Sequence, residues 1–279
     1  MLFLLPMKIA IYIGTEHIRS DKRLTDLVSG LEAGGCETYV TGWGNALCDD
    51  TDILLSVGGD GTFLSAAIMA ISNSVPVAGV NMGRMGFLSE NRPEDVVEAI
   101  LSGEYAVESR TMLSVDMEES GAADDGFIPY ALNEVTIRRN GAAMLGVDVC
   151  VNGVKLPTYW GDGLVISTSS GSTAYSLSVG GPIVLPESKV LIISPIAPHN
   201  LNVRPLVVPD SSVLEISTQS RDGHFELSAD NRTMDVPDTT KVSVGMAQFS
   251  LKRVRLSKSN FIQALTDKLY WGEDLRNIR

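Results

Sequence analysis

A glycine-rich turn with a single carboxylate follows an apolar stretch in the first quarter of the chain. Ile53–Val57 reads as a buried strand, and it runs directly into Gly58-Gly59-Asp60-Gly61-Thr62. Glycines allow positive φ and let backbone amides approach a ligand closely, so such a turn before a helix favours phosphate binding. The turn lacks the lysine of a Walker loop and the spacing of a dinucleotide fingerprint. Asp60 is therefore its one ionisable group.

A carboxylate beside phosphates has two chemical uses. It can accept a proton from an attacking hydroxyl, or it can help to hold a magnesium ion, and both uses belong to phosphoryl transfer. The alternative is a tight turn in which Asp60 caps the following helix. On this turn alone, the two interpretations stand about even.

A polar block later in the chain is a second signal, and it decides between these two interpretations of Asp60. The apolar run Asp162–Ser167 leads into Thr168–Pro182, which is rich in serine, threonine and glycine around Tyr175. Read alone, the block is compatible with a serine-rich loop, and Ser172 invites comparison with serine hydrolases. A Gly-x-Ser-x-Gly elbow is missing, which disfavours the hydrolase.

Four segments together resemble the NAD kinase family. They are the turn Gly58–Thr62, the segment Asn81–Leu88, the pair Asn133-Glu134, and the block Gly171–Ser178. The resemblance runs from about Met7 to the end of the chain. The turn alone is shared with diacylglycerol and sphingosine kinases, and phosphofructokinases have a related one, so the turn indicates only a superfamily. The later block narrows the resemblance to the NAD kinase family.

The resemblance implies an activity. It implies transfer of the γ-phosphate of ATP, or of a polyphosphate, to the 2′-hydroxyl of the adenosine ribose of NAD, giving NADP. Magnesium would bridge the phosphates, without a metal site made of protein groups only. A ribose hydroxyl is a weak nucleophile and needs a base within hydrogen-bond reach, for which Asp60 is the candidate.

The resemblance also implies which residues bind the substrates. Asn133 and Glu134 would hold ribose hydroxyls, and Asp162 would hold the nicotinamide riboside end. Tyr175 would offer a ring face to adenine. Read alone, Asn133-Glu134 favours a turn, Asp162-Gly163 is equally unspecific, and Phe87 is as compatible with the core as with an adenine wall. The full predicted set is Gly58, Gly59, Asp60, Gly61, Thr62, Phe87, Asn133, Glu134, Asp162, Thr173, Ala174, Tyr175, Ser176, Leu177, Ser178, Ala197 and Asp230.

Some positions depart from the family pattern. Trp160 stands where many relatives have an arginine, and Thr168-Ser169-Ser170 stands where Thr-Pro-Thr is usual. We expect the first departure to alter phosphate or partner-subunit contacts. The ligand position assigned to Asp230 is aligned only to within a residue or two.

The composition of the chain limits the kinds of partner and ligand that it can bind. The formal net charge of −12 repels phosphate backbones and anionic lipid, which disfavours nucleic-acid or membrane-surface binding. Three cysteines are too few for a disulfide framework, and the three histidines show no metal-ligand spacing. The apolar opening before Met7 lacks the marks of a leader and reads as a short extension. We expect a cytoplasmic enzyme, and the resemblance implies a homodimer or homotetramer.

Periodicity predicts an α/β domain followed by a β-rich one. Strand and helix patterns alternate through residues 1–110, as in a Rossmann-like, mostly parallel sheet. Short β-rich runs fill 111–255, which predicts a β-sandwich or multi-sheet domain that would bind NAD. The strands expected there include Ala131–Ile137, Val242–Val244 and Phe249–Leu256. A helix over Asn260–Trp271, in the tail 256–279, is expected to pack back on the first domain.

Two other functions are alternatives to an NAD kinase. A lipid or sphingoid kinase would need an apolar channel or a membrane-facing surface, which the charge and the polar block disfavour. A protein that senses NAD(P) without turnover would tolerate loss of the base, but Asp60 is present.

Overall fold

A computed structural model describes residues 6–83, 86–118 and 126–272. The chain forms two compact units, one of Met1–Ser109 with Leu251–Arg279 (unit 1) and one of Arg110–Ser250 (unit 2). Arg84 and Met85 of the Asn81–Leu88 segment, most of the opening extension, and the last seven residues of the tail lie outside the described residues. Among the helices that are described, none is both long and apolar enough to cross a membrane.

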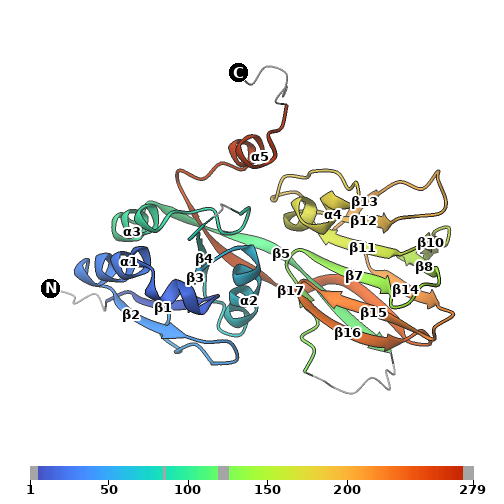
Figure 1. The fold of residues 1–279 in the computed structure, drawn as a ribbon, viewed down its shortest axis with the longest axis horizontal. Helices are drawn as coiled ribbons and strands as arrows, with labels where there is room; N and C mark the ends of the chain where they lie inside the picture. Colours follow the sequence, from blue (N-terminus) through green and yellow to red (C-terminus); the bar gives the residue numbers. More distant parts are fainter. Residues whose placement is uncertain (1–5, 84–85, 119–125, 273–279) are drawn as a thin grey trace. The chain divides into compact units, whose positions relative to one another are not determined.

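Unit 1 is an α/β structure (Figure 1). Its elements are β1 (Lys8–Ile13), the 3₁₀ helix η1 (Glu16–Ser20), α1 (Lys22–Ala33), β2 (Glu37–Thr41), β3 (Ile53–Val57), α2 (Asp60–Ile71), β4 (Val77–Val80), α3 (Pro93–Ser102) and α5 (Phe261–Leu269). The end of β17 (Lys241–Leu256) joins them, and it pairs with β4 at Arg253. The strand order is β17-β4-β3-β1-β2, and every pairing is parallel.

Helices cover both faces of the unit 1 sheet, because its central strands are apolar on both sides. Ile9 and Ile11 of β1 join one core with α1 and α3, whereas Ala10 between them is buried outside that core. Helix α1 begins at Asp21, whose carboxylate accepts from the Arg23 N–H, and its Leu24, Leu27 and Leu31 enter the same core. The predicted alternation of strands and helices is present, with Ile53–Val57 as β3 and α5 inside the predicted helix Asn260–Trp271; β2 and η1 were not predicted.

Unit 2 is built of strands and two short helices (Figure 1). Its elements are β5 (Tyr105–Glu118), β6 (Tyr130–Ala131), β7 (Glu134–Arg139), β8 (Leu145–Val151), β9 (Val154–Lys155), β10 (Tyr159–Gly161), β11 (Gly163–Thr168), the 3₁₀ helix η2 (Ser170–Thr173), α4 (Tyr175–Ser178), β12 (Val190–Ile196), β13 (Leu206–Pro209), β14 (Leu214–Gln219), β15 (His224–Ala229), β16 (Arg232–Pro237) and most of β17.

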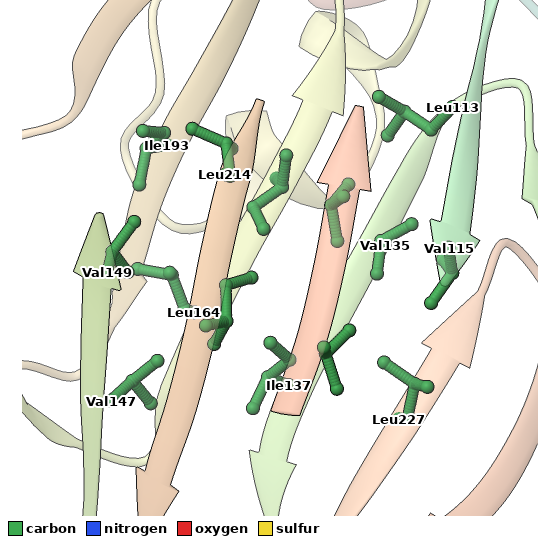
Figure 2. Close-up of a cluster of buried hydrophobic side chains, with 14 of the residues drawn as sticks. Leu113, Val115, Val135, Ile137, Val147, Val149, Leu164, Ile193, Leu214 and Leu227 are labelled. Carbon is green, nitrogen blue, oxygen red and sulfur yellow. The ribbon is translucent and has the colours of Figure 1, made fainter. Parts of the chain in front are cut away.

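The strands of unit 2 form two sheets. One runs β13-β12-β11-β7-β15-β16, and the other contains β10-β8-β14-β17, with β5, β6 and β9 attached. Their pairings are antiparallel. Side chains from both sheets meet in one apolar core, and Figure 2 shows Val135 and Ile137 of β7 in it with Val147 and Val149 of β8. This confirms the expected class, an α/β domain with a β-rich one.

Two strand boundaries differ from expectation. The run Ala131–Ile137 is interrupted between β6 and β7, because the N–H groups of residues 132–134 bond to a side chain instead of a strand. Val242–Val244 and Phe249–Leu256 belong to the single strand β17, in which buried and exposed residues alternate through the residues between them.

Candidate active site

The glycine turn connects β3 to α2 in unit 1. Gly58 has φ 155°, and a Cβ there would lie 2.4 Å from the Thr62 hydroxyl oxygen, so the close approach requires glycine. Helix α2 begins at Asp60, and its N-cap residue is Gly59, which has no side chain to cap the helix. A cavity of about 220 Å³ opens beside the turn, lined by Thr15, His17, Ile18, Gly58, Gly59, Thr62, Asn81, Met82 and Gly83.

Asp60 does not cap its own helix. Its Oδ1 accepts from the N–H groups of Leu88 and Ser89, at 3.1 and 2.8 Å, and its Oδ2 accepts from the Phe87 N–H at 2.9 Å. The loop can wrap the carboxylate this closely because residue 86 is glycine: a Cβ on Gly86 would lie 1.9 Å from Asp60 Oδ1. The alternative of Asp60 as a simple helix cap is wrong.

Basic side chains support the loop that holds Asp60. Arg253 donates to the carbonyls of Phe87 and Leu88, at 3.2 and 3.4 Å, and pairs with Glu90 at 2.8 Å. Lys268 of α5 donates to the Gly86 carbonyl, and its Nζ lies 4.7 Å from the centre of the Phe87 ring. Burial lowers the pKa of Lys268, against the attraction of Glu90 and Asp60.

Phe87 is half-buried, and it packs against Phe261 of α5 with ring centres 6.0 Å apart. Part of the ring is therefore available to a ligand. Lys268, Arg253 and Phe261 were missed from the sequence, because no motif connects the tail to a loop more than 160 residues earlier.

The pair Asn133-Glu134 lies in unit 2, where β7 begins. Both residues are buried, 7 % and 8 % exposed, which is unusual for an amide and a carboxylate. Asn133 Oδ1 and Glu134 Oε2 have no hydrogen-bond partner within the described part of the chain. Burial first, and then the charge of Asp230, raise the pKa of Glu134 to about 8, while the Tyr175 N–H opposes the shift. Such buried acceptors are costly unless a ligand satisfies them.

Asp230 lies directly behind this pair. Its Oδ1 accepts from the N–H groups of Asn133 and Glu134, at 2.8 and 3.2 Å, and its Oδ2 accepts from the Leu132 N–H at 2.8 Å. The Arg232 guanidinium lies 3.9 Å from Oδ2. The Asp230 side chain is only 1 % exposed, so its carboxylate faces the backbone of the turn.

The polar block packs against the same turn. The Thr168 N–H donates to the Asn133 carbonyl at 2.9 Å, and the Thr168 hydroxyl donates to the Leu132 carbonyl at 2.6 Å. Gly171 approaches so closely that a Cβ would lie 2.1 Å from the Asn133 carbonyl oxygen. Tyr175, whose N–H bonds to Glu134, begins α4. The structure thus brings together two motifs that are about 40 residues apart.

Residues within the block differ in exposure. Thr173, Ala174, Tyr175 and Leu177 are half-buried, Ser178 is exposed, and Ser176 is buried with its hydroxyl 3.4 Å from that of Ser194. The Ser172 hydroxyl is also buried, and it bonds to both the N–H and the carbonyl of Val184 at 3.1 Å. A serine held in this way is not placed as a nucleophile, so the hydrolase alternative has no support.

The remaining predicted residues lie at the ends of β10, β11 and β12. Asp162 is 43 % exposed at its side chain and pairs with Arg139, whose Nε donates to its Oδ1 at 2.7 Å. Ala197 is exposed and adopts a positive φ of 43°. The Trp160 ring lies against Gly146 and lines a cavity of about 720 Å³ with Met144, Gln219 and Arg221. Arg139 was missed, because one of two adjacent arginines at a strand end carries no signal.

The fold and the site together define a class of protein. It is a small-molecule kinase in which an α/β unit carries a glycine turn and a β-sandwich carries a turn with buried polar side chains. Two family models match the chain, the ATP-NAD kinase N-terminal domain over residues 22–105 and the ATP-NAD kinase C-terminal domain over residues 132–256. The chain belongs to the NAD kinase family.

Individual relatives agree. An NAD kinase of Bacteroides fragilis is 40% identical over 231 residues, which cover 81% of this chain and 79% of that protein. An NAD kinase of Flavobacterium psychrophilum is 38% identical over 230 residues, which cover 81% and 78%.

Solved structures of similar fold include a yeast NADH kinase complexed with NADH. Its TM-score is 0.84 at 22% identity, and the match covers 99% of this chain and 91% of that one. An NAD kinase from Archaeoglobus fulgidus in complex with ATP has a TM-score of 0.76 at 25% identity, and the match covers 95% and 99%. The first of these supports the fold alone.

Proposed function

We propose that this protein transfers the γ-phosphate of ATP to the 2′-hydroxyl of the adenosine ribose of NAD, giving NADP. Family membership supports the reaction. The observation that carries the assignment to named residues is a pair of buried acceptors, Asn133 Oδ1 and Glu134 Oε2, for which the described part of the chain provides no hydrogen-bond partner.

These two acceptors suit ribose hydroxyl groups. A hydroxyl donates one hydrogen bond, and a pair of neighbouring ribose hydroxyls can donate to an amide oxygen and a carboxyl oxygen side by side. Binding then relieves the cost of two unsatisfied buried atoms, so the ligand gains affinity from groups that are unfavourable in the free protein. A sugar without these hydroxyls would leave the cost in place.

Asp60 is proposed as the general base, and the hydrogen bonds identify its reactive atom. An ionised carboxylate has about four acceptor positions, and three are used by the loop amides. Oδ1 accepts two of these bonds and Oδ2 accepts one. Among the described residues, the acceptor position left open is therefore on Oδ2, which would take the proton from the 2′-hydroxyl when the two oxygens are within about 3 Å.

The glycine turn is proposed to bind donor phosphates through its amides. The first amides of α2 and the positive end of the helix favour negative charge beside Gly59 and Gly61, which are both exposed. The cavity beside the turn has room for phosphate oxygens, and its His17 and Thr15 offer further polar groups.

Magnesium is proposed only as an ion held by ATP. The described residues contain no group of three or more metal-ligating side chains. The ion would be bound mainly by the phosphates, with at most one carboxylate such as Asp60. Its contribution would be to neutralise charge on the transferred phosphoryl group.

The block in unit 2 is proposed to hold the adenosine end of NAD. The half-buried Tyr175 ring offers an aromatic face, and the exposed Ser178 offers a polar group to a base edge. Ala197 of the same unit is proposed as a further apolar contact, and Phe87 of unit 1 is proposed separately as an apolar wall for an adenine ring. Asp162, fixed by Arg139, keeps one carboxylate oxygen for the nicotinamide riboside end.

The test is product identity. Purified protein is incubated with NAD, magnesium and either ATP or polyphosphate, and the product is analysed by ³¹P NMR and by a dehydrogenase that accepts only NADP. We expect a 2′-phosphomonoester with ATP; the polyphosphate arm decides the donor range. Tight NAD binding without any phosphorylated product would instead identify a nicotinamide-dinucleotide sensor.

A further inference from the structure

Asp230 has the burial of a structural residue and the neighbours of a functional one. Its carboxylate is 1 % exposed and accepts from three consecutive backbone N–H groups, those of Leu132, Asn133 and Glu134. A ligand cannot reach oxygens that are closed off in this way. Two of the three residues that it binds carry the unpartnered acceptors described above.

We propose that Asp230 is a positioning residue for NAD: its carboxylate anchors the backbone of residues 132–134, so that Asn133 and Glu134 present their free oxygens to the ribose. This inference rests on the proposed function, and it gives Asp230 a role through the turn instead of a contact with the ligand.

The backbone of Asp230 supports this role. The residue has φ 52°, a left-handed conformation that costs about 1 kcal/mol for a side chain other than glycine. In this conformation its own N–H donates to the Glu134 carbonyl at 2.9 Å, while its carboxylate accepts from the Glu134 N–H. The two residues are therefore bonded in both directions, and the strained conformation is retained where it completes the arrangement.

The turn is clamped from two sides. Asp230 holds the N–H side of residues 132–134, whereas Thr168 holds the carbonyl side through its bonds to Leu132 and Asn133. A segment bonded on both sides has little freedom. The side chains of Asn133 and Glu134 are then held in place before a ligand arrives, which lowers the entropy cost of binding.

Asp230 also settles which of two neighbouring carboxyls carries the charge. Counted over the residues that the structure describes, Asp230 has three N–H donors and the nearby Arg232, whereas Glu134 has one donor, the Tyr175 N–H. Burial raises the pKa of both carboxyls, but the donors and Arg232 oppose this shift at Asp230, so the charge is favoured on Asp230 and the proton on Glu134. A protonated Glu134 both accepts and donates, which suits a pair of adjacent hydroxyls.

The experiment measures NAD binding separately from turnover. NAD affinity is determined by calorimetry for the wild type, Asp230→Asn, Glu134→Gln and the double variant, with exposed Asp116→Asn as the matched control in the same unit. KM for NAD and for ATP is measured in parallel. In the intact wild type, hydrogen exchange of the amides of residues 132–134 is followed with and without NAD, which needs no variant to fold.

We expect Asp230→Asn to weaken NAD binding by about 10- to 100-fold, the usual effect of losing an orienting partner, with KM for ATP unchanged. The double variant should be little weaker than the worse single one, because both changes act on one turn. The three amides should exchange slowly in the free protein. Unchanged NAD affinity in Asp230→Asn, additive losses, or amides protected only when NAD is bound would overturn the inference. If the wild type binds NAD but makes no NADP, the proposed function fails while the binding comparison still tests Asp230.

Discussion

Glu134 is proposed to serve the ligand at the expense of stability, and the substitution Glu134→Gln separates the two effects. Burial and the charge of Asp230 raise the pKa of Glu134 from 4.5 to about 8. Because the folded pKa lies above the unfolded one, the folded state binds an extra proton between these two values. The free energy of unfolding therefore falls as the pH rises from about 4.5 to about 8.

The size of this effect follows from the shift. Each pKa unit corresponds to about 1.4 kcal/mol, so the wild type should lose up to about 4 kcal/mol between about pH 5 and pH 8.5 through this one group. Glutamine does not titrate, and its amide oxygen can still accept from the Tyr175 N–H that bonds to Glu134. We expect Glu134→Gln to match the wild type near pH 5 and to be more stable by a few kcal/mol near pH 8.5.

The assay is urea unfolding of the free protein at both pH values. Trp160 reports on unit 2, and the exposed Trp43 and Trp271 are replaced by phenylalanine in both proteins so that only this signal remains. NAD affinity should fall in the variant although its stability rises. A stability difference that is independent of pH would refute the assignment of the proton to Glu134.

Other substitutions test other parts of the site. Gly171→Ala places a methyl group where a Cβ would meet the Asn133 carbonyl oxygen at 2.1 Å, so we expect a loss of about 1–3 kcal/mol in urea unfolding and weaker NAD binding; unchanged affinity would show that the two segments can separate freely. Lys268→Met removes a charge held over the Phe87 ring, beside the loop that holds Asp60, and we expect kcat to fall about 3- to 10-fold. Stability should not fall, because the variant no longer buries a charge. A destabilised protein with normal kcat would contradict this expectation. Ser172→Ala should keep its rate within about 3-fold while losing about 1–3 kcal/mol of stability, since its hydroxyl serves only the neighbouring loop; loss of all activity in a folded protein would restore a chemical role for this serine.

Much of the α/β unit could be predicted because its strands are buried on both faces. Ile53–Val57 and Val77–Val80 are mostly apolar and buried at every position, and the structure has strands with these bounds. Strand β2 was missed because it lies at the edge of the sheet, where Glu37 and Val40 are exposed and no alternation is visible.

The β-rich unit shows why pattern alone gives wrong boundaries. The apolar run Ala131–Ile137 predicts one strand, yet residues 132 and 133 lie outside β6 and β7, because Asp230, almost 100 residues away, accepts the N–H groups of residues 132–134. The same contact explains why the sequence predicted Asp230 as a functional residue but did not predict its position behind the turn. Motifs identify which side chains carry chemistry, whereas long-range hydrogen bonds decide which of them face a ligand.

Some expectations stay predictions. The assignment of each residue to ATP or NAD, the homodimer or homotetramer and the role of Trp160 are among them. Light scattering of the purified protein would measure the assembly size directly.

Asp60 is proposed to accept the proton of the attacking hydroxyl, and the single-turnover rate of NADP formation by Asp60→Asn measures this role directly. Exposed Asp49→Asn in the same unit is the control, and NAD binding by calorimetry shows whether the variant is folded. We expect a rate lower by about 10²–10⁴-fold in a variant that still binds NAD. A rate within a few-fold of the wild type, with NAD bound as well, would contradict it.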